Sequence, residues 1–363
     1  MTSIERLAEW SLSNAPEFRD PLAVRQARLI SLDSIGCMIA GRRSPTARSI
    51  VELVADFGGR PDCTVVGAGF RTNAPNAVLA NGVLVRALDL NEVMFIEKDG
   101  HLGVGGHCSD TYPVALAIAE MTGATWSDTF ETLVMGFEMF ARLREVMPPS
   151  SSWDGASSCG LVAAAMTGRL MKLDAEAQAH ALAFSATRCA TPKVVRWGEL
   201  TSIKNIAGAL VAESAVRGAM MAARGLTGPL EALDHRGGLH QVFDPRLDFS
   251  RLWAPASGPP RILLSHVKTW PCIGTGQTAV GAAIELHPKL AGRTDSIEKI
   301  VVTMMDAPMI RDQQAEESRR LPRTHEDADH SFTFLPVVAM VDGDVGERQF
   351  EHERWMKIGR AHV

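Results

Sequence analysis

The sequence predicts a mainly α protein, with a large all-helical domain followed by a smaller α+β lid domain. Through about residue 255, long Ala-, Leu-, Met- and Gly-rich stretches dominate and β-branched alternations are few, which is typical of helices. From residue 256 the composition changes to a linker, ASGPPR, followed by mixed helix-like and strand-like segments. The length of 363 residues also exceeds one typical domain. We therefore expect the all-helical domain over residues 1–255 and the lid over residues 256–357.

Local signals define several of these elements. Ser44 followed by Pro45 predicts the N-cap and first turn of a helix through IVELVADF, which Gly58 ends. Thr125 and Asp128 have the spacing of a capping box before TLVMGFEMFARLREVM. In the second part of the chain, TAVGAAIEL predicts a short helix and SIEKIVVTMM predicts a strand.

Composition and charge exclude several classes of function. The net charge of −5 is spread along the chain without a basic stripe, so we expect no nucleic-acid or anionic-membrane partner. The six cysteines form no CxxC pair, which argues against zinc ribbons and a disulfide framework. The N-terminus lacks the apolar core of a secretory signal, and no apolar run reaches the roughly 20 residues that cross a bilayer. We expect a soluble cytoplasmic protein that binds any anionic substrate through local positive charge.

The last six residues, IGRAHV, resemble the translation of a constant sequencing adapter. We therefore expect residues 358–363 to be an artefact and the lid to be truncated. The alternative is an ordinary polar tail.

The segment from Arg86 to Asp110 concentrates acids, histidines and glycines between two apolar helices. Helical spacing puts Asp89 on the face of Val78, Gly82 and Val85, so its carboxylate is expected to point into the protein as a candidate acid or base. An Asp that merely ends a helix by binding backbone amides is the alternative.

His101, His107 and Cys108 superficially suggest a metal site, but a third ligand with suitable spacing is absent, and we predict no metal. His107 is better interpreted as a proton-transfer group or a carboxylate binder. A loop histidine bonded to backbone is the alternative.

Lys204 shares its helix face with small, apolar residues such as Gly208 and Ala215, whereas Glu213 and Arg217 fall on the opposite side. This pattern turns the ammonium group inward, where an anionic ligand is a reasonable partner. The alternative is a first-turn lysine that extends to solvent.

Lys268 precedes a turn with Gly274 and Gly276 that leads into a helix, whose free amide groups favour an anion. We interpret this stretch as a second carboxylate clamp, with a surface lysine beside an ordinary turn as the alternative. It lacks the GxGxxG spacing and contains Pro271, so a dinucleotide cofactor is not expected.

Several separated segments, in the same order, resemble the MmgE/PrpD family, and together they cover nearly the whole chain. They are LDSIGCMIAGRRSP, NGVLVRALDLNEV, GGHCSD, WDGASSCGLVAAAMTGRLMKLD, RWGELTSIKNIAGALVAESAVRGAMMAARGLTGP, GQTAVGAAIEL and EDADHSFTFLPVVAMVDGDV. The last two are more similar to the 2-methylcitrate dehydratase branch, which acts in propionate catabolism, than to cis-aconitate decarboxylases or iminodisuccinate epimerases.

The resemblance implies a homodimer with an active site between the two domains and no metal or organic cofactor. It implies abstraction of a proton α to a carboxylate and departure of a protonated hydroxyl, while lysines neutralise the growing charge. Which residue is the acid and which the base stays open. The implied catalytic residues are Asp89, His107, Lys204 and His330, and the implied substrate-binding residues are Lys268, Ser109, Gly274, Gly276, Gln277 and Ser331.

The sequence also departs from the family pattern. Asn91 stands where a second acid is frequent, Gly155 where a histidine is, Cys108 where a proline is, and Phe334 where a tyrosine is. Loss of an imidazole and a phenol could change the substrate or remove a proton donor. The leading expectation is dehydration of 2-methylcitrate or a similar small polycarboxylate. The alternatives are a decarboxylase or epimerase on the same scaffold, or a catalytically inactive binding subunit.

Overall fold

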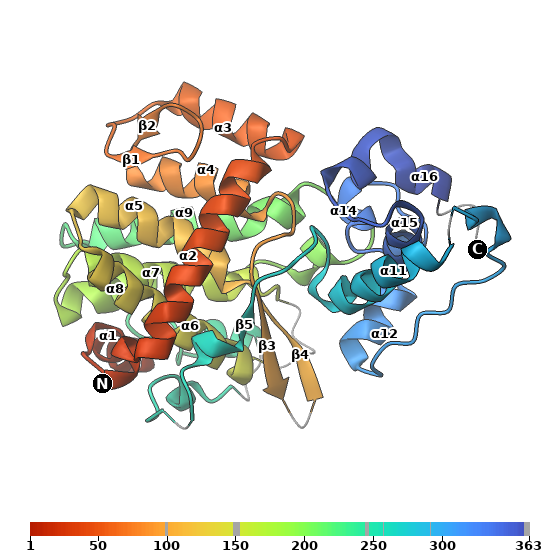
Figure 1. The fold of residues 1–363 in the computed structure, drawn as a ribbon. Helices are drawn as coiled ribbons and strands as arrows, with labels where there is room; N and C mark the ends of the chain where they lie inside the picture. The colour runs from red at the N-terminus through yellow and green to blue at the C-terminus, as the bar shows by residue number, and fades with distance from the viewer. Residues whose placement is uncertain (99–100, 148–152, 244–246, 257, 291, 359–363) are drawn as a thin grey trace.

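The computed structural model describes residues 1–98, 101–147, 153–243, 247–256, 258–290 and 292–358 (Figure 1). These residues form a mainly α fold, which confirms the predicted fold class. The helices are α1 Ser3–Leu12, α2 Pro21–Gly41, α3 Pro45–Phe57, α4 Ala74–Arg86, α5 Tyr112–Thr122, α6 Trp126–Val146, α7 Ala156–Leu170, α8 Ala175–Ala186, α9 Ile203–Ala222, α10 Leu239–Phe243, α11 Gln277–Leu290, α12 Pro308–Ala315, α13 Glu317–Arg320, α14 His325–Ala328, α15 Phe334–Asp342 and α16 Arg354–Ile358. The strands are β1 Cys63–Thr64, β2 Arg71–Thr72, β3 Val93–Lys98, β4 His101–Gly106 and β5 Ser265–His266.

Helices α1–α9 build a first body around the central helix α4, all of whose residues are buried. Helix α9 packs against α4, α7 and α8. A Cβ atom at Gly82 would lie 2.7 Å from the Ala209 Cβ, so the close approach of α4 and α9 requires a glycine there. This packing fixes α9, which carries Lys204, and the end of α4, which Asp89 follows by three residues.

The expected helix boundaries of the first body are found. Helix α3 begins at Pro45 after Ser44 and ends at Gly58, whose φ is 62°. Thr125 and Asp128 form the predicted capping box of α6. Among the helices in the described ranges, none combines the length and apolar character needed to cross a membrane.

A small antiparallel sheet interrupts the first body, where the sequence indicated only helices and a loop. Strand β3 lies between β4 and β5, and its pairing with β4 shifts register between Met94 and Phe95. The glycine-rich strand β4, HLGVGG, lacks a clear alternation of side chains, so its pattern did not reveal a strand. The sheet carries His107 directly after β4.

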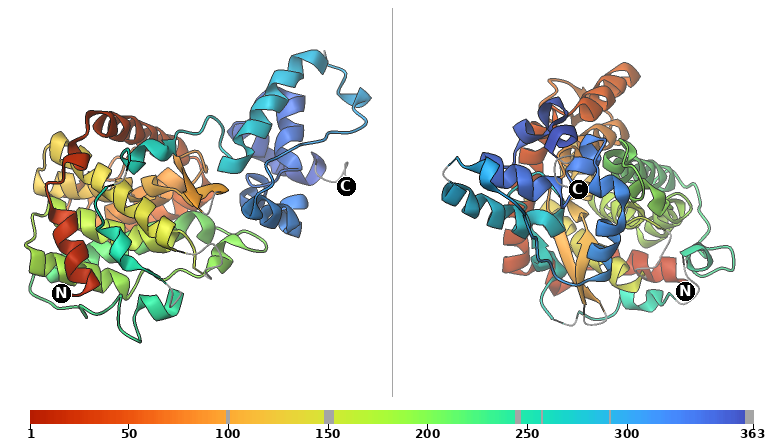
Figure 2. Two further views of the ribbon diagram at one scale, coloured as in Figure 1. Left: turned by 90° about the horizontal axis from the view of Figure 1, so that it is seen from below. Right: turned by 90° about the vertical axis from the view of Figure 1, so that its right-hand side faces the viewer.

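Helices α11–α16 form a second body beside the first (Figure 2). Its hydrophobic cluster begins at Cys272 and ends at Trp355, whereas the cluster of the first body ends at Ile262. The chain therefore leaves the core of the first body and enters the core of the second body between residues 262 and 272. The predicted helix TAVGAAIEL lies in α11, which packs against α15.

The predicted strand SIEKIVVTMM is wrong: residues 297–305 form no strand ladder. A strand needs a neighbour for its backbone N–H and C=O groups, and the described part of the second body supplies none. The expected α+β lid therefore contains helices and loops but no strand among the described residues from 270 onward. The suspected tail, except Ile358 at its start, lies outside the described residues.

Candidate active site

Asp89 is the centre of a buried charged cluster between the two bodies. It is only 1% exposed, as its spacing predicted, but α4 ends at Arg86 and Asp89 lies beyond the helix at a φ of 48°. The prediction that Asp89 is part of the helix is therefore wrong, because the chain turns out of the helix after Arg86. An aspartate tolerates this left-handed conformation better than most residues, although it remains strained.

Hydrogen bonds from Lys268 hold Asp89 against the segment that leads into the second body. Its Nζ donates to the Asp89 backbone oxygen (2.5 Å), to the Asp89 carboxylate (2.8 Å) and to the Cys272 backbone oxygen (3.2 Å). Since an ammonium group has three N–H donors, all three are used within the chain. Lys268 thus positions Asp89 and adds positive charge.

Lys204, in the first turn of α9, is fully buried, which agrees with the inward face predicted for it. Its Nζ donates to both carboxylate oxygens of Asp329, at 3.0 and 2.8 Å, and lies 3.5 Å from the Asp89 carboxylate. Asp329 comes from the turn after α14, so this pair joins the two bodies.

His330 follows Asp329 and completes a dyad. Its Nδ1 bonds the Asp329 carboxylate, and its Nε2 lies 3.4 Å from Asp89. His107 approaches Asp89 from the first body, with Nε2 3.9 Å from the carboxylate. His107 Nδ1 lies 2.6 Å from the backbone oxygen of Glu92, which can only accept, so this nitrogen carries the proton. Both imidazoles therefore direct Nε2 toward Asp89.

Behind Asp89 lies a layer of polar groups, in which the sequence analysis had assigned a site role to Ser109 but not to Arg86 or Asp110. Arg86 donates to the carboxylate of Asp89 and to the amide oxygen of Asn91 (3.1 Å). The Asn91 amide nitrogen donates to Ser109 Oγ (2.9 Å) and to Asp110 (3.0 Å). An amide in place of an acid at position 91 removes one negative charge from the cluster.

Burial and charge fix the protonation states. Burial opposes ionisation of Asp89, but Arg86 and Lys268 outweigh it and hold the pKa of Asp89 well below its usual range. Burial and the positive charge of Lys204 lower the pKa of His330 to about 4. Burial and Arg86 also hold the pKa of His107 well below its usual range.

Near neutral pH, three cations thus face two carboxylates and two neutral imidazoles. The cations are Arg86, Lys204 and Lys268, and the carboxylates are Asp89 and Asp329, whose pKa is also lowered because Lys204 outweighs the effect of burial. Asp110, behind Asn91, is a third carboxyl group within electrostatic reach of Arg86, and burial raises its pKa. Three buried cations at one place suit an anionic ligand.

Asp89, Asp329 and His330 also have the geometry of a three-residue metal site among the described residues. Two ammonium groups already bind these carboxylates, at 2.8 Å each, and would repel a metal ion. The site as a whole, with its two ammonium groups, therefore fits an anionic ligand better than a metal cation.

The other predicted binding residues lie around the cluster and not within it. Gln277 is used by the loop that carries Lys268: its side chain accepts from Trp270 N (3.2 Å) and donates to Trp270 O (2.9 Å). Ser331 Oγ accepts from Phe334 N (3.1 Å) at the start of α15. Ser109 contacts Asn91, one residue layer behind Asp89. We therefore do not assign Gln277 or Ser331 direct contact with substrate.

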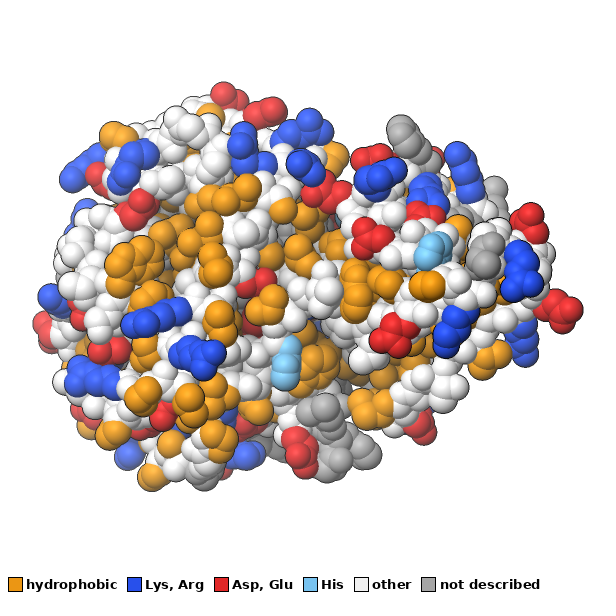
Figure 3. Space-filling view, in the orientation of Figure 1, with side chains coloured by type: hydrophobic (Ala, Val, Ile, Leu, Met, Phe, Trp, Pro, Cys, Tyr) orange, Lys and Arg blue, Asp and Glu red, His pale blue; other side chains and the backbone are white. Residues whose placement is uncertain are grey.

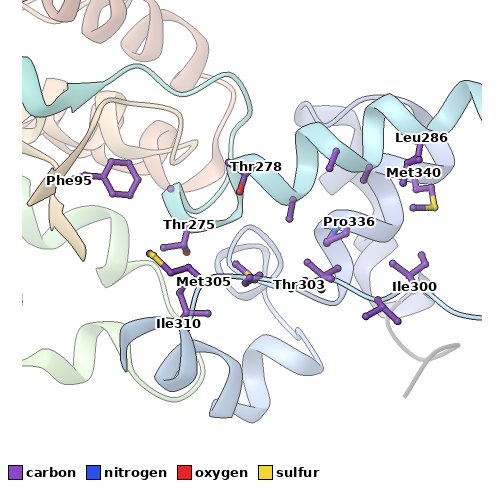
Figure 4. A pocket seen from close by; sticks show the side chains of 17 residues that line it. Phe95, Thr275, Thr278, Leu286, Ile300, Thr303, Met305, Ile310, Pro336 and Met340 are labelled. Atoms are coloured by element: carbon purple, nitrogen blue, oxygen red, sulfur yellow. The ribbon is translucent and has the colours of Figure 1, made fainter. Parts of the chain in front are cut away.

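Gly274 and Gly276 lie at the start of α11, on the side of an apolar cavity. This cavity of about 440 Å³ is bounded by α11 and residues 300–305, and Figure 4 shows its mainly hydrophobic side chains. Gly274 lines it, whereas a Cβ at Gly276 would meet Ile273 at 3.0 Å. Among the described residues, no charged side chain lines the cavity. The cavity therefore supplies no cation that would help Gly274 and Gly276 to bind the anion that the sequence had predicted there.

Arg86 and Asp329 were missed because their partners are set by the fold. One signal was available: an arginine at the end of an otherwise apolar helix needs a buried anion. Nothing in the run EDADHS distinguishes Asp329 from its acidic neighbours, and its partner Lys204 lies 125 residues away. The side chain of His101 lies outside the described residues, and Cys108 is buried beside Thr111.

Glu92 supports His107 and gives a testable pH dependence. Its carboxyl group accepts from Ser109 N (3.0 Å) and Ser265 Oγ (2.8 Å), and burial raises its pKa to about 7 from 4.5. The folded protein therefore keeps a proton that the unfolded chain releases above pH 4.5, so stability falls as pH rises toward 7. We expect a loss of roughly 3 kcal/mol at most across this window, measured by urea unfolding.

Glu92→Gln is the matched control, because the amide imitates the protonated acid in shape. The variant should lose this part of the pH dependence and exceed wild type in stability near pH 8. An unchanged slope in the variant would contradict the assignment of the titration to Glu92.

The fold and the site together define a mainly α protein with a buried cluster of cations, carboxylates and imidazoles. The profile of the MmgE/PrpD N-terminal domain matches residues 5–252, and that of the MmgE/PrpD C-terminal domain matches residues 270–360. The chain therefore belongs to the MmgE/PrpD family, whose members are generally enzymes, and the predicted family is confirmed. The 2-methylcitrate dehydratase branch stays a prediction.

Among curated proteins, the chain is similar to the cis-aconitate decarboxylase-like protein oryM of Aspergillus oryzae (strain ATCC 42149 / RIB 40). The two are 22% identical over an alignment of 374 positions, which covers 95% of this chain and 74% of the relative.

Proposed function

We propose that this protein is a cofactor-independent lyase that removes a proton beside a carboxylate of a small polycarboxylate, with 2-methylcitrate or a close relative as substrate and loss of water as the outcome. One observation carries the proposal. Two neutral imidazoles direct Nε2 toward a cluster that contains three buried cations. Such a site can bind an anion and accept a proton from it.

His330 is the proposed base. Asp329 holds its Nδ1 side, which leaves Nε2 to accept the α proton. The positive charge of Lys204 lowers the pKa of His330, and a bound substrate carboxylate would offset that charge. Substrate binding therefore makes His330 a stronger base at the moment it is needed.

Lys204 is the proposed binder of the substrate carboxylate beside the reacting carbon. When the proton leaves, negative charge grows on that carboxylate, and a buried ammonium group stabilises it. His107 lies across Asp89 and is the proposed proton donor to the departing hydroxyl, after its Nε2 has taken a proton from solvent before the lid closes. The lone pair of the α carbon then forms the double bond as the C–O bond breaks.

Residues from both bodies form this cluster, so we propose that residues 256–357 act as a lid over the domain 1–255. Besides Lys204 and Asp329, the Leu200 N–H donates to Asp327 (3.0 Å) and Arg319 donates to the Arg196 backbone oxygen (2.9 Å). A substrate must enter before these contacts close, and the closed lid would exclude water.

Decarboxylation of a cis-aconitate-like acid is the second candidate function, favoured by the similarity to the cis-aconitate decarboxylase-like protein of A. oryzae. In that reaction, a carboxylate leaves as carbon dioxide and a proton is delivered to the same carbon. The cluster could serve both reactions, since each passes through a carbanion-like state beside a carboxylate.

The test is product analysis with 2-methylcitrate, citrate and cis-aconitate, in the presence of a chelator. Water loss from the first two should raise ultraviolet absorbance through a new alkene. Carbon dioxide release from cis-aconitate alone would support the second candidate, and no turnover of any acid by folded protein would contradict both.

We also propose a cytoplasmic homodimer that pairs through α2. Leu22, Leu29, Leu32 and Ile39 share one face of this helix and are 62%, 48%, 70% and 56% exposed. Hydrophobic side chains gather over α2 in Figure 3. Contiguous apolar patches on a protein surface commonly mark interfaces.

Leu32→Glu is therefore expected to convert a dimer into a monomer, because a charge would be buried without a partner. Light scattering measures the change in mass. Val301→Glu is a matched control, since Val301 is 71% exposed and lies on the second body. A dimer that survives Leu32→Glu would place the interface elsewhere, and a monomeric wild type would rule out the dimer.

A further inference from the structure

We propose that Arg144, facing the open position at Gly155, binds a second carboxylate of the substrate and so selects tricarboxylates over dicarboxylates. This inference rests on the proposed function. It concerns a carboxylate other than the one beside Lys204.

Arg144, near the end of α6, is a half-buried cation without a close anionic partner. Its Nε donates to the Gly105 backbone oxygen (2.7 Å), and its NH1 lies 4.0 Å from Met147 Sδ. Within the described ranges, no carboxylate lies within ion-pair distance of it. Asp154, the carboxylate that acts on Arg144 electrostatically, is bound to Arg196 at 3.1 Å.

Arg142, two residues earlier in α6, shows the contrast. Its guanidinium is more deeply buried than that of Arg144, and it forms an ion pair with Glu138 at 2.8 Å. A buried guanidinium is costly without an anion, because burial removes its hydration. Arg144 is therefore suited to receive its anion from a ligand.

Gly155 leaves space in front of this guanidinium. Its φ of −58° and ψ of −25° suit any residue, so the backbone does not require a glycine. Among the described residues, the atoms nearest to a Cβ placed there belong to Arg144, with the guanidinium carbon at 3.6 Å and NH1 at 3.8 Å. These are ordinary contact distances, so the glycine is not needed to avoid a clash. A side chain at this position would cover the guanidinium, and the glycine leaves it uncovered.

Arg144 also lies beside the charged cluster. Gly105, which accepts from Arg144, precedes His107 by two residues, or roughly 7 Å along an extended chain. On the other side, the Cys159 thiol is within electrostatic reach of both Arg144 and Asp110. Asp110 is bonded to Asn91, which contacts Arg86 of the cluster. A substrate at Lys204 can thus extend a further carboxylate toward Arg144.

The experiment is titration calorimetry with citrate, which has three carboxylates, and citramalate, which has two. We expect Arg144→Gln to weaken citrate binding about tenfold or more, because a charge-assisted hydrogen bond is lost, and to change citramalate binding less than about twofold. Gly155→Leu keeps Arg144 and its bond to Gly105 but fills the open space. It should weaken citrate selectively as well, and thermal unfolding of both variants checks their fold.

Lys204→Met separates this inference from the proposed function. It should weaken both ligands, because both place a carboxylate beside the ammonium group. Equal effects of Arg144→Gln on citrate and citramalate, or no effect on either, would overturn the Arg144 subsite even if Lys204→Met weakens both. Unchanged binding in Lys204→Met would instead overturn the proposed site, and a wild type that binds neither acid would overturn both proposals.

Discussion

Replacing Lys204 by methionine is expected to lower turnover by about 10²–10³-fold and to destabilise the fold. The ammonium group lies 2.8 Å from Asp329 and 3.5 Å from Asp89, and it is the proposed partner of the substrate carboxylate. Loss of one such electrostatic donor typically has this effect on the rate. Removing one partner of a buried pair costs about 3–5 kcal/mol, which urea unfolding would measure.

The double variant Lys204→Met, Asp329→Asn separates catalysis from stability. Neutralising Asp329 removes the carboxylate left without its cation, so part of the lost stability should return while turnover stays low. Lys299→Met, on an exposed lysine, is the control for loss of a positive charge. Full activity in the single Lys204 variant would contradict the placement of the site.

Asp329→Asn should lower kcat by about 10²–10⁴-fold, because Asp329 holds the imidazole of His330 by its Nδ1. Asp329 also raises the pKa of His330, which burial and Lys204 hold at about 4. Its neutralisation should therefore move the imidazole titration to lower pH. Nuclear magnetic resonance of the His330 ring protons measures this shift, which a purely structural role would not predict.

Asp327→Asn is the matched control two residues earlier. Asp327 forms a buried ion pair with Arg319 (2.7 Å) and accepts from the Leu200 N–H (3.0 Å). Its substitution should cost stability but leave the His330 titration nearly unchanged. Equal shifts in both variants would mean that a general loosening of the second body, and not the dyad, sets the pKa of His330.

The sequence predicted the inward lysine because helix geometry is local. The small residues that share a face with Lys204 are periodic along one helix, so its burial could be inferred without any tertiary information. Asp89 was expected to be buried for a similar reason, and it is, although the helix stops before it. Periodicity indicates a direction but does not locate the residue at which a chain leaves the helix.

The partners of these residues could not be predicted in the same way. Asp329 meets Lys204 only because the second body folds back on the first. The strand expected at SIEKIVVTMM failed for a related reason, since strand pairing depends on a neighbour that the local pattern does not specify. The hairpin β3–β4 was missed because the glycines of β4 conceal its alternation.

The structure shows what surrounds Phe334 and Gly155, two residues that depart from the family pattern. Phe334 is buried in the core of the second body, where its ring lies 5.8 Å from that of Phe350, so the missing phenol leaves a packed core. Gly155 leaves space beside Arg144. The first change does not disturb the charged cluster, and the second is compatible with a larger anionic substrate.

The most direct test of the central claim is exchange of the substrate's α proton with solvent deuterium, followed by nuclear magnetic resonance with 2-methylcitrate and citrate. With wild-type protein we expect deuterium at the carbon beside the carboxylate, or the alkene product, and with His330→Gln we expect neither. Tight binding of these acids without exchange or product, in folded wild-type protein, would contradict the claim that the cluster removes this proton and would favour an inactive binding subunit.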